Sequence, residues 1–325
     1  MHEAGGVTYL VKDIFLEITN VCNDNCLFCP YRTMTRKKGF MDYNFYCGVI
    51  DQIASDRIGP YVCLCIMGEP LLHKRVFDMV KYATDKGVGT MIFTNLSYLN
   101  EDAIEKLYAN GLTALALSLH VGEEDSFKRV RNSKLDFDAF YSNAITALRK
   151  RFIMDAKTRV EIHNMFAMVD RYNFVNSPEK AEEIYAKWCG IVENFAHEYH
   201  RPYQRPLKPD FKKIFGSWIA SIPVCDGINV VYKKECYSQI MRSEESVKPT
   251  LHGGCGNPFE QIGILQDGSV TYCCLDYDGK LVYGNLKDAS LKNIWEGEKG
   301  QSIRDDFKNG ILSNKFCQHC QGKNI

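Results

Sequence analysis

Cysteine spacing is the feature of this sequence that points most directly to chemistry. The chain holds 14 cysteines among 325 residues, and Cys22, Cys26 and Cys29 follow the pattern C-x3-C-x2-C. Three thiolates so close along the chain cannot all pair as disulfides, but they can hold three corners of an iron–sulfur cluster. A cuboidal cluster has four irons, so the pattern predicts one open iron that can bind a substrate or cofactor. A zinc site would need a fourth ligand nearby, and none is evident in the sequence.

A second group of cysteines falls within residues 251–325. Its members are Cys255, Cys273, Cys317 and Cys320. Two short apolar runs at 261–266 and 269–273 flank Asp267-Gly268, which predicts a β-hairpin that folds the first two of these cysteines toward each other. The C-x2-C pair then closes the site. Four thiolates fill an iron–sulfur cluster completely and suit zinc equally well, so the residues alone leave both metals open.

The elements that must position the first cysteines alternate between strands and helices. Strand-length apolar runs lie at 14–19, 61–67, 90–94, 114–119 and 160–168. Helical spacing of apolar residues predicts helices near 43–54, 76–83, 101–109, 137–148 and 181–188. Repeated strand–helix units predict an α/β fold in which helices cover a parallel sheet, either an open sheet or a partial barrel. The first cysteine loop follows the first strand, at the edge where such sheets place their ligand sites.

These elements divide the chain into a core over residues 1–195, a connector over 196–250 and a C-terminal domain over 251–325. The connector opens with an irregular proline-rich stretch, and residues 201–213 hold five Lys or Arg and one Asp. This basic stretch is either a solvated loop or a contact for an anionic substrate group. The C-terminal domain is expected to combine the hairpin with a helix near 291–295.

Composition limits the classes of function. Forty Lys and Arg balance forty Asp and Glu, and this zero net charge argues against nucleic-acid binding through a broadly basic surface. No run reaches the roughly 18 apolar residues of a membrane span, and the N-terminus lacks the pattern of a secretory signal. We therefore expect a cytoplasmic protein with no membrane or nucleic-acid partner, in which reduced cysteines serve metals or redox chemistry.

The first cysteine group resembles the signature of the radical S-adenosylmethionine (SAM) superfamily, in which an aromatic residue, here Phe28, precedes the last cysteine. Met67-Gly68-Glu69-Pro70 resembles the family's Gly-Gly-Glu-Pro motif, with Met67 where the family has glycine. The resemblance implies a partial (β/α)6 barrel and a 4Fe–4S cluster whose open iron binds the amino and carboxylate groups of SAM. It also implies reductive cleavage of SAM to a 5′-deoxyadenosyl radical that abstracts hydrogen from the substrate.

The same resemblance implies a set of SAM-binding residues. They are Phe28, Met67, Gly68, Glu69, Asn95, Ser118 and Arg131. Backbone groups near Met67 and Gly68, with the Glu69 carboxylate, would hold the SAM ammonium, although Glu69 also suits a helix N-terminus. Ser118 and Arg131 would contact the SAM carboxylate, and a surface ion pair is the other interpretation of Arg131.

Three further polar residues lie near the ends of the predicted strands. His120 stands where relatives often have Asp, and His163 and Asn164 fall on the fifth strand. The last two either face the pocket or serve the structure, as a strand histidine often does.

The second cysteine group resembles the C-terminal extension called SPASM, and especially its short form, the twitch domain. Cys273-Cys274-Leu275-Asp276 and Gly284-Asn285-Leu286 belong to this match. A full SPASM domain has further cysteines after the C-x2-C pair and binds two auxiliary clusters, whereas this chain has none after Cys320. The resemblance therefore implies one auxiliary 4Fe–4S cluster and two clusters in all. The layout looks most like the twitch-type dehydrogenases and epimerases of aminoglycoside biosynthesis.

Seven cysteines remain outside the two groups. They are Cys47, Cys63, Cys65, Cys189, Cys225, Cys236 and Cys274. Cys63 and Cys65 share one face of a predicted strand and are expected in the core. Cys225, Cys236 and Cys274 are expected where the domains meet. There, Cys225 or Cys274 could donate a hydrogen atom to a substrate radical, although a buried structural thiol is the simpler interpretation.

Four functions are compatible with these motifs. The first is oxidation of an alcohol to a ketone in a sugar or aminocyclitol, with the auxiliary cluster as electron acceptor. The second is epimerisation through a cysteine hydrogen donor, and the third is modification of a ribosomally made peptide. The fourth is a non-catalytic zinc- or cluster-binding protein, which the matches around Glu69 and Arg131 disfavour. A radical reaction also implies an external electron donor such as flavodoxin or ferredoxin.

Overall fold

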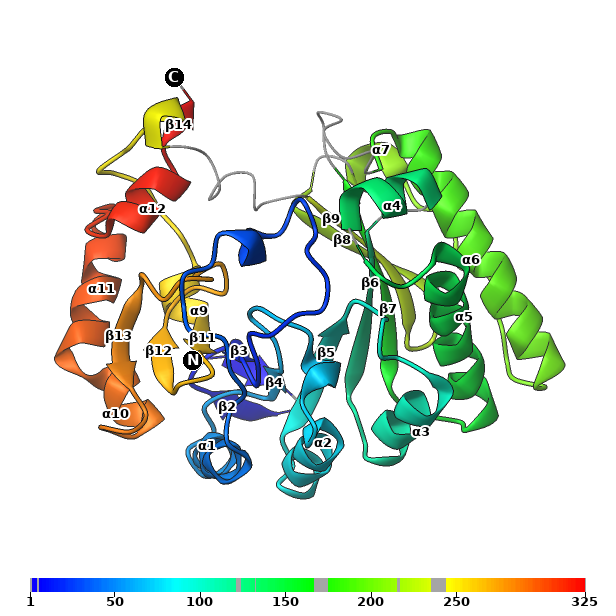
Figure 1. Ribbon diagram of the computed structural model, residues 1–325, viewed down its shortest axis with the longest axis horizontal. Helices are drawn as coiled ribbons and strands as arrows, with labels where there is room; N and C mark the ends of the chain where they lie inside the picture. Colours follow the sequence, from blue (N-terminus) through cyan, green and yellow to red (C-terminus); the bar gives the residue numbers. More distant parts are fainter. Residues whose placement is uncertain are drawn as a thin grey trace.

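A curved ten-stranded sheet forms the centre of the computed structural model (Figure 1). The structure describes residues 2–4, 6–120, 124–131, 133–166, 175–214, 217–234 and 244–324. Six neighbouring strands of the sheet are parallel: β3 (Asp13–Leu16), β4 (Tyr61–Cys63), β5 (Gly89–Thr94), β6 (Ala114–His120), β7 (Arg159–Phe166) and β9 (Ile228–Lys234). The expected partial (β/α)6 barrel is therefore confirmed.

Helices cover the outer face of this barrel, as Figure 1 shows. The five that the apolar spacing predicted are α1 (Tyr43–Ser55), α2 (Val76–Asp85), α3 (Glu101–Ala109), α5 (Phe137–Ile153) and α6 (Pro178–Glu198). Four of them begin at a side chain that accepts a hydrogen bond from a first-turn N–H, namely Asp42, Asn100, Asp136 and Ser177. Such caps satisfy donors that the helix itself leaves open.

The strands β3 and β4 end before the residues that the sequence predicted. β3 stops at Leu16 and β4 at Cys63, three and four residues short of the expected ends. One residue beyond these points, the Glu17 and Leu64 N–H groups still donate to the Ile264 and Met91 carbonyls of neighbouring strands. Closer to the site the regular pairing ends, and the Met67 N–H donates to the Glu17 carboxylate at 3.2 Å. Both segments are therefore irregular where they approach the candidate site.

A two-stranded hairpin lies within residues 196–250, where a connector was expected. β8 (Ile219–Cys225) and β9 form an antiparallel hairpin, and β9 joins β7 as the sixth parallel strand. Asp226-Gly227 makes the turn, with Gly227 at φ +70°. The Asp-Gly signal that located the C-terminal hairpin also marks this one, because both turns need a residue with positive φ.

The C-terminal domain extends the same sheet beyond β3. β11 (Gln261–Ile264) runs parallel to β3, and β12 (Ser269–Thr271) and β13 (Val282–Asn285) follow in antiparallel order. The predicted hairpin is confirmed, with Gly268 at φ +91° in its turn. The helices α10 (Leu291–Glu296), α11 (Glu298–Lys308) and α12 (Lys315–Cys320) follow. Pairing of β11 with β3 places the second cysteine group beside the strand that leads into the first.

Short elements complete the described part of the chain. They are β1 (His2–Ala4), β2 (Val7–Tyr9), η1 (Pro30–Arg32), η2 (Pro70–Leu72), α4 (Glu124–Arg131), α7 (Phe211–Ile214), η3 (Glu244–Ser246), β10 (Val247–Lys248), α9 (Asn257–Glu260) and β14 (Lys323–Asn324). Among the helices described, none has the length and apolar character needed to cross a membrane.

The junction between β3 and β11 gives a test of the fold. Leu16 is fully buried there, so we expect Leu16→Ala to lower the free energy of unfolding by about 2–5 kcal/mol. Leu207→Ala is the matched control, because Leu207 is 94% exposed and its loss should change stability by less than about 0.5 kcal/mol. Urea denaturation followed by circular dichroism measures both values, and equal midpoints for the two variants would contradict this packing.

Candidate active site

A cavity of about 210 Å³ opens at the carboxyl ends of the parallel strands. Three cysteines and all seven residues of the expected SAM set line it: Cys22, Cys26, Phe28, Cys29, Met67, Gly68, Glu69, Asn95, Ser118 and Arg131. They come from the loop after β3, the loop after β4, the ends of β5 and β6, and α4. The fold therefore brings together residues that are widely separated in the sequence.

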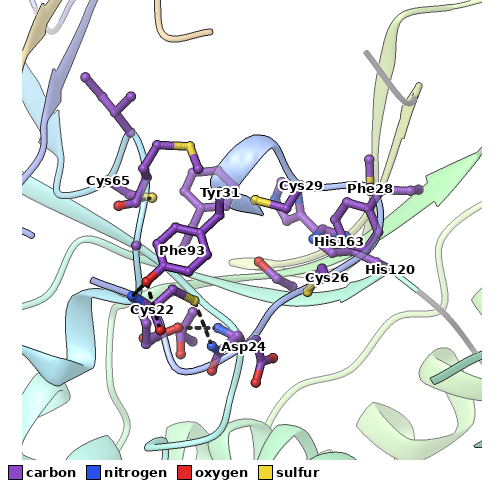
Figure 2. Close-up of a pocket in the computed structure, with 18 of the residues that line it drawn as sticks. Cys22, Asp24, Cys26, Phe28, Cys29, Tyr31, Cys65, Phe93, His120 and His163 are labelled. Atoms are coloured by element: carbon purple, nitrogen blue, oxygen red, sulfur yellow. Dashed lines mark hydrogen bonds between the residues drawn. The ribbon is translucent and has the colours of Figure 1, made fainter. Parts of the chain in front are cut away.

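The first cysteine loop is held by its own hydrogen bonds and by α4. The Tyr31 hydroxyl accepts from the Cys22 N–H and donates to the Cys22 carbonyl, both at 3.2 Å. The Leu27 N–H donates to the Val130 carbonyl of α4 at 2.9 Å. Figure 2 shows the three sulfur atoms of the loop around one space. Among the residues that the structure describes, no three His, Cys, Asp or Glu side chains are placed so that they could hold a metal ion.

The chemistry of these thiols fits an iron–sulfur cluster. Burial raises the pKa of Cys22 and of Cys29 to about 12, and it raises the pKa of Cys26 as well. Thiolates in such surroundings need compensating positive charge, which bound iron supplies. The Asn95 amide also donates to the Cys22 sulfur at 3.7 Å. Hydrogen bonds of this kind tune sulfur atoms that ligate clusters.

Arg131 joins the first cysteine loop to two strands of the barrel. It pairs with Asp24 of the loop at 3.3 Å, and both side chains are buried, so the surface ion pair considered for Arg131 is wrong. Nη2 also donates to the Asn95 carbonyl at 3.1 Å, and Nη1 donates to the Ser118 carbonyl. Nε is buried and has no hydrogen-bond partner among the residues that the structure describes. The guanidinium thus keeps one donor for a ligand carboxylate.

Glu69 combines the two roles that the sequence offered for it. Its carboxylate accepts from the Leu71 N–H at 3.1 Å and so caps η2, and it accepts from the Asn95 N–H at 2.6 Å. The side chain also lines the cavity. Burial raises the pKa of Glu69 to about 7 despite these two hydrogen bonds. A cation bound in the cavity would favour the ionised carboxylate.

In Met67-Gly68-Glu69-Pro70, the backbone conformation at position 68 requires glycine. It has φ +82°, and a Cβ there would lie 2.6 Å from the Thr19 carbonyl oxygen and 2.8 Å from the Val21 carbonyl oxygen. The next residue, Glu69, donates its N–H to the same Val21 carbonyl at 2.8 Å. Close contact between the two loops thus depends on a missing side chain.

The inner face of the barrel forms the other wall of the cavity. It contributes Phe15, Cys63, Cys65, Phe93, His120, His163, Asn164, Met165 and Lys233. His120 has φ +62° and meets the Phe28 ring edge-on at 5.4 Å, and burial lowers the pKa of His120. Phe93 and Lys233 are not among the site residues expected from the sequence. Strand residues two positions apart point to the same face, so Phe93 is expected to face the same way as Asn95. Lys233 pairs in register with Met165, which also lines the cavity.

The second cysteine group gathers around the start of α9, the end of β12 and α12. Burial raises the pKa values of Cys273 and Cys317, and the nearby thiol of Cys255 adds to both effects; Cys320 also adds to that of Cys317. The Cys273 sulfur accepts from the Leu275 N–H and from the Asn257 amide, each at 3.4 Å. Four neighbouring thiols with N–H donors on a sulfur fit a fully ligated iron–sulfur cluster.

One small apolar cluster contacts both cysteine groups. Its buried residues are Ile66, Met67, Leu265 and Tyr277. Cys29 of the first group and Cys320 of the second group both pack against it. The two groups therefore lie on either side of a few side chains that exclude water.

A buried ion pair also connects the two groups. The guanidinium of Arg36 donates two hydrogen bonds to the Glu17 carboxylate, both at 2.7 Å, and its Nε donates to the Tyr277 carbonyl at 2.8 Å. The same carboxylate accepts from the Met67 and Gln266 N–H groups, each at 3.2 Å. Glu17 thus bonds to the first cysteine loop, the glycine motif and the C-terminal hairpin.

The remaining cysteines fall in different places. Cys274 lines the cavity, and Cys63 and Cys65 line it too, so the last two face the site and are not simply core residues. Cys225 lies at the end of β8 beside the turn to β9, at the opposite end of the barrel from the cavity. The fold therefore does not bring Cys225 to the site. Cys47 lies on α1, Cys189 is buried on α6, and Cys236 lies outside the described residues.

The basic stretch 201–213 is also separate from the cavity. None of its residues belongs to the cavity lining that the structure describes. Lys208 pairs with Glu182 of α6 at 2.6 Å, and Arg201 pairs with Asp155 at 3.5 Å. These contacts agree with a solvated loop and give no support to a substrate contact.

Comparison with known proteins places two segments of the chain in described families. Residues 16–160 match the Radical SAM superfamily, and residues 255–321 match SPASM, an iron–sulfur cluster-binding domain. The chain is 30% identical to the AdoMet-dependent heme synthase of Methanosarcina barkeri, over 94% of this chain and 90% of that protein. It is 28% identical to the S-adenosyl-L-methionine-dependent 2-deoxy-scyllo-inosamine dehydrogenase of Niallia circulans, over 97% and 95%.

Two solved structures share the fold. One is BtrN in complex with AdoMet and 2-DOIA, with a TM-score of 0.52, 20% identity, and coverage of 94% of this chain and 89% of that one. The other is Streptococcus suis SuiB bound to the precursor peptide SuiA, with a TM-score of 0.59, 12% identity, and coverage of 91% and 67%.

Gly68 gives the first test of the site. A non-glycine residue at such a φ is strained by about 1–2 kcal/mol, and the added methyl group would push the loop that carries Glu69 away from Thr19. We therefore expect Gly68→Ala to weaken SAM binding by about tenfold or more, measured by equilibrium dialysis of the cluster-loaded protein. Gly190→Ala on α6 is the control, because a Cβ there meets nothing within 4 Å. Equal affinities would show that this close contact is not needed.

Glu69 gives a pH-dependent test. Because burial raises its pKa to about 7, the carboxyl group is largely protonated at pH 6 and largely ionised at pH 7.5. If the ionised form holds the SAM ammonium, affinity for SAM should rise roughly eightfold over this range. Glu69→Gln should bind SAM weakly and without this rise. A wild-type affinity that stays constant with pH would exclude the contact.

Proposed function

The chain belongs to the radical SAM superfamily and carries a C-terminal SPASM-type iron–sulfur domain, and we propose that it is a dehydrogenase that oxidises an alcohol of a sugar or aminocyclitol to a ketone. The observation that carries this proposal is the position of Cys274 and Leu275, which follow Cys273 directly and line the main cavity. An electron acceptor at the second cysteine group would therefore border the space for SAM and substrate. Similarity over nearly the whole chain to a 2-deoxy-scyllo-inosamine dehydrogenase supports the same reaction.

The cofactors of this protein are SAM, the 4Fe–4S cluster of the radical SAM superfamily and iron–sulfur in the C-terminal domain. In our proposal the first cluster is ligated by Cys22, Cys26 and Cys29, and one auxiliary 4Fe–4S cluster by Cys255, Cys273, Cys317 and Cys320. When bound, these groups supply reductive cleavage of SAM to a 5′-deoxyadenosyl radical and an acceptor for the second substrate electron. An external donor such as flavodoxin or ferredoxin provides the electron for cleavage.

The side chains of the cavity bind and orient SAM in this proposal. The Glu69 carboxylate and the backbone at Gly68 hold the ammonium, and Arg131 Nε with Ser118 holds the carboxylate. Phe28 and Phe93 line the cavity and limit the access of water to the reacting carbon.

Epimerisation is the second candidate reaction, because the Cys274 side chain lines the cavity. A thiol there can return a hydrogen atom to the substrate radical from the opposite face. The two reactions differ in their products: a dehydrogenase yields a ketone, whereas an epimerase yields an isomer that carries one hydrogen from solvent.

Anaerobic reconstitution followed by a substrate panel tests the proposal. The panel contains aminocyclitols and amino sugars, among them 2-deoxy-scyllo-inosamine, and a precursor-type peptide. We expect about eight irons per chain, 5′-deoxyadenosine from SAM with reductant, and a ketone from a member of the small-molecule set. Deuterium from heavy water in an unoxidised isomer would support epimerisation instead. Zinc without iron, or turnover of the peptide alone, would overturn the proposal.

Substitution of single cysteines separates the two clusters. Cys26→Ala should abolish SAM cleavage, because it removes a ligand of the first cluster. Cys317→Ala should spare slow cleavage of SAM but stop ketone formation, because the second electron then has no acceptor. Cys47→Ala on α1 is the control and should retain both activities. A ketone formed at the wild-type rate by Cys317→Ala would show that the second cluster is dispensable.

A further inference from the structure

A line of polar side chains runs along the inner face of β7 into the cavity. Arg159, Glu161 and His163 occupy alternate positions of this strand, so their side chains share one face. Arg159 Nε donates to one Glu161 carboxylate oxygen, and the other carboxylate oxygen contacts His163 Nε2, both at 2.8 Å. Arg159 is exposed, whereas His163 is buried and lines the cavity. None of these residues takes part in the SAM contacts described above.

The hydrogen bonds determine which nitrogen of His163 can accept a proton. Burial alone would raise the pKa of Glu161, but the hydrogen bonds from His163 and Arg159 and the charge of Arg159 lower that pKa. Glu161 is therefore a carboxylate, which can only accept hydrogen bonds, so His163 Nε2 carries the proton between them. The other nitrogen, Nδ1, keeps a lone pair that can accept a proton.

The surroundings of His163 favour the neutral imidazole. The titratable groups that share this wall of the cavity with His163 are Cys63, Cys65, His120 on β6 and Lys233 on β9. Arg159 and Glu161 lie on the same face of β7. Phe93 of β5 meets the imidazole edge-on at 5.0 Å. Burial lowers the pKa of His163 and the charge of Lys233 lowers it further, while Glu161 opposes both effects. A neutral imidazole aligned by a carboxylate is suited to act as a base.

Several other acid–base groups of the cavity are engaged, or no partner orients them. His120 lines the cavity, but its buried Nδ1 has no hydrogen-bond partner among the described residues. Asp24 pairs with Arg131, and the Glu69 carboxylate holds two backbone N–H groups. Cys22, Cys26 and Cys29 are the proposed cluster ligands. His163 is thus the group of the barrel wall that is oriented by a partner and available to a substrate.

We propose that His163, oriented by Glu161, is the catalytic base that removes the hydroxyl proton of the substrate. The assignment rests on the proposed dehydrogenation. In that reaction a C–H hydrogen atom leaves to the radical derived from SAM, and the hydroxyl proton passes to His163 Nδ1. One electron then leaves to the auxiliary iron–sulfur cluster as the C=O bond forms. Loss of one hydrogen atom, one proton and one electron accounts for the conversion of an alcohol to a ketone. Glu161 is a positioning residue, and Lys233 can stabilise the negative charge that develops on the substrate oxygen.

This assignment is tested by measuring reaction rates with the panel substrate that the wild-type protein oxidises. We expect His163→Gln to lower the rate of ketone formation by about 10²- to 10³-fold, with unchanged iron content and SAM affinity. Glu161→Gln should lower the rate less. The wild-type rate should fall at low pH as His163 takes up a proton, and in Glu161→Gln this fall should move to lower pH, because the carboxylate raises the pKa of His163. A purely structural role would not move the pH profile.

A measurement without substrate gives an independent readout. Exchange of the imidazole C2 hydrogen in heavy water, followed by mass spectrometry of the cluster-loaded protein, reports the pKa of each histidine. We expect a His163 pKa below its usual value of about 6.5, and a lower one in Glu161→Gln. His197→Gln, on the exposed side of α6, is the control and should leave the rate, the pH profile and His163 exchange unchanged.

The outcomes separate the two proposals. If the wild-type protein forms no ketone from any member of the panel, the dehydrogenase function fails, and the role of His163 fails with it. If the wild-type protein forms a ketone and His163→Gln forms it equally fast with the same pH profile, the role of His163 alone is overturned. Should His163→Gln not fold, Glu161→Gln decides: an unchanged pH profile and unchanged His163 exchange would overturn the assignment.

Discussion

The structure depends on one buried ion pair, between Glu17 and Arg36. The Glu17 carboxylate lies just beyond the end of β3, fully buried, with two hydrogen bonds from Arg36 and two from backbone N–H groups. Burial raises the pKa of Glu17, and the donors lower it only in part, so the buried carboxylate depends on all four hydrogen bonds. These donors come from the first cysteine loop, the loop before Gly68 and the C-terminal hairpin. Removal of either charge would leave its partner buried and unpaired, and three segments would lose their common anchor.

Burial also shifts the pKa values of the groups that line the cavity, and this shift favours the binding of charged ligands. The Glu69 carboxyl, the His163 imidazole and five thiols have pKa values shifted toward their neutral forms by loss of water; the thiols are those of Cys22, Cys26, Cys29, Cys273 and Cys317. Such groups gain from a bound cation, a cluster or a substrate proton more than exposed groups would. Arg131 follows the same principle, since its buried Nε has no partner among the described residues. Ligand binding thus satisfies groups that folding leaves incomplete.

The cavity has two walls with different origins, and this division explains its chemistry. Loops at the carboxyl ends of the strands provide the cysteines and the expected SAM contacts, whereas alternate strand residues provide His163 and Lys233 on the inner face. Cys274 and Leu275, which follow Cys273, also line the cavity. Cys29 and Cys320 both pack against one apolar cluster. This cluster excludes water between the two cysteine groups. A reaction that needs a radical, a base and an electron acceptor finds candidates for all three around one cavity.

The sequence by itself determined the features that depend on neighbouring residues. The C-x3-C-x2-C loop, the Gly68-Glu69 motif, the helix faces and the Asp-Gly turn at 267–268 all act over a few positions, so spacing and residue type were sufficient to predict them. Strand ends were less predictable, because the backbone of Met67 bonds to the distant Glu17 side chain instead of a strand. Only the tertiary structure decided which distant residues meet. Parallel register of β7 and β9 brought His163 and Lys233 to the cavity, and the pairing of β11 with β3 brought the hairpin that leads to Cys274 there. The antiparallel β8 left Cys225 at the other end of the barrel. A sequence does not specify such contacts, because they depend on how strands far apart in the chain align.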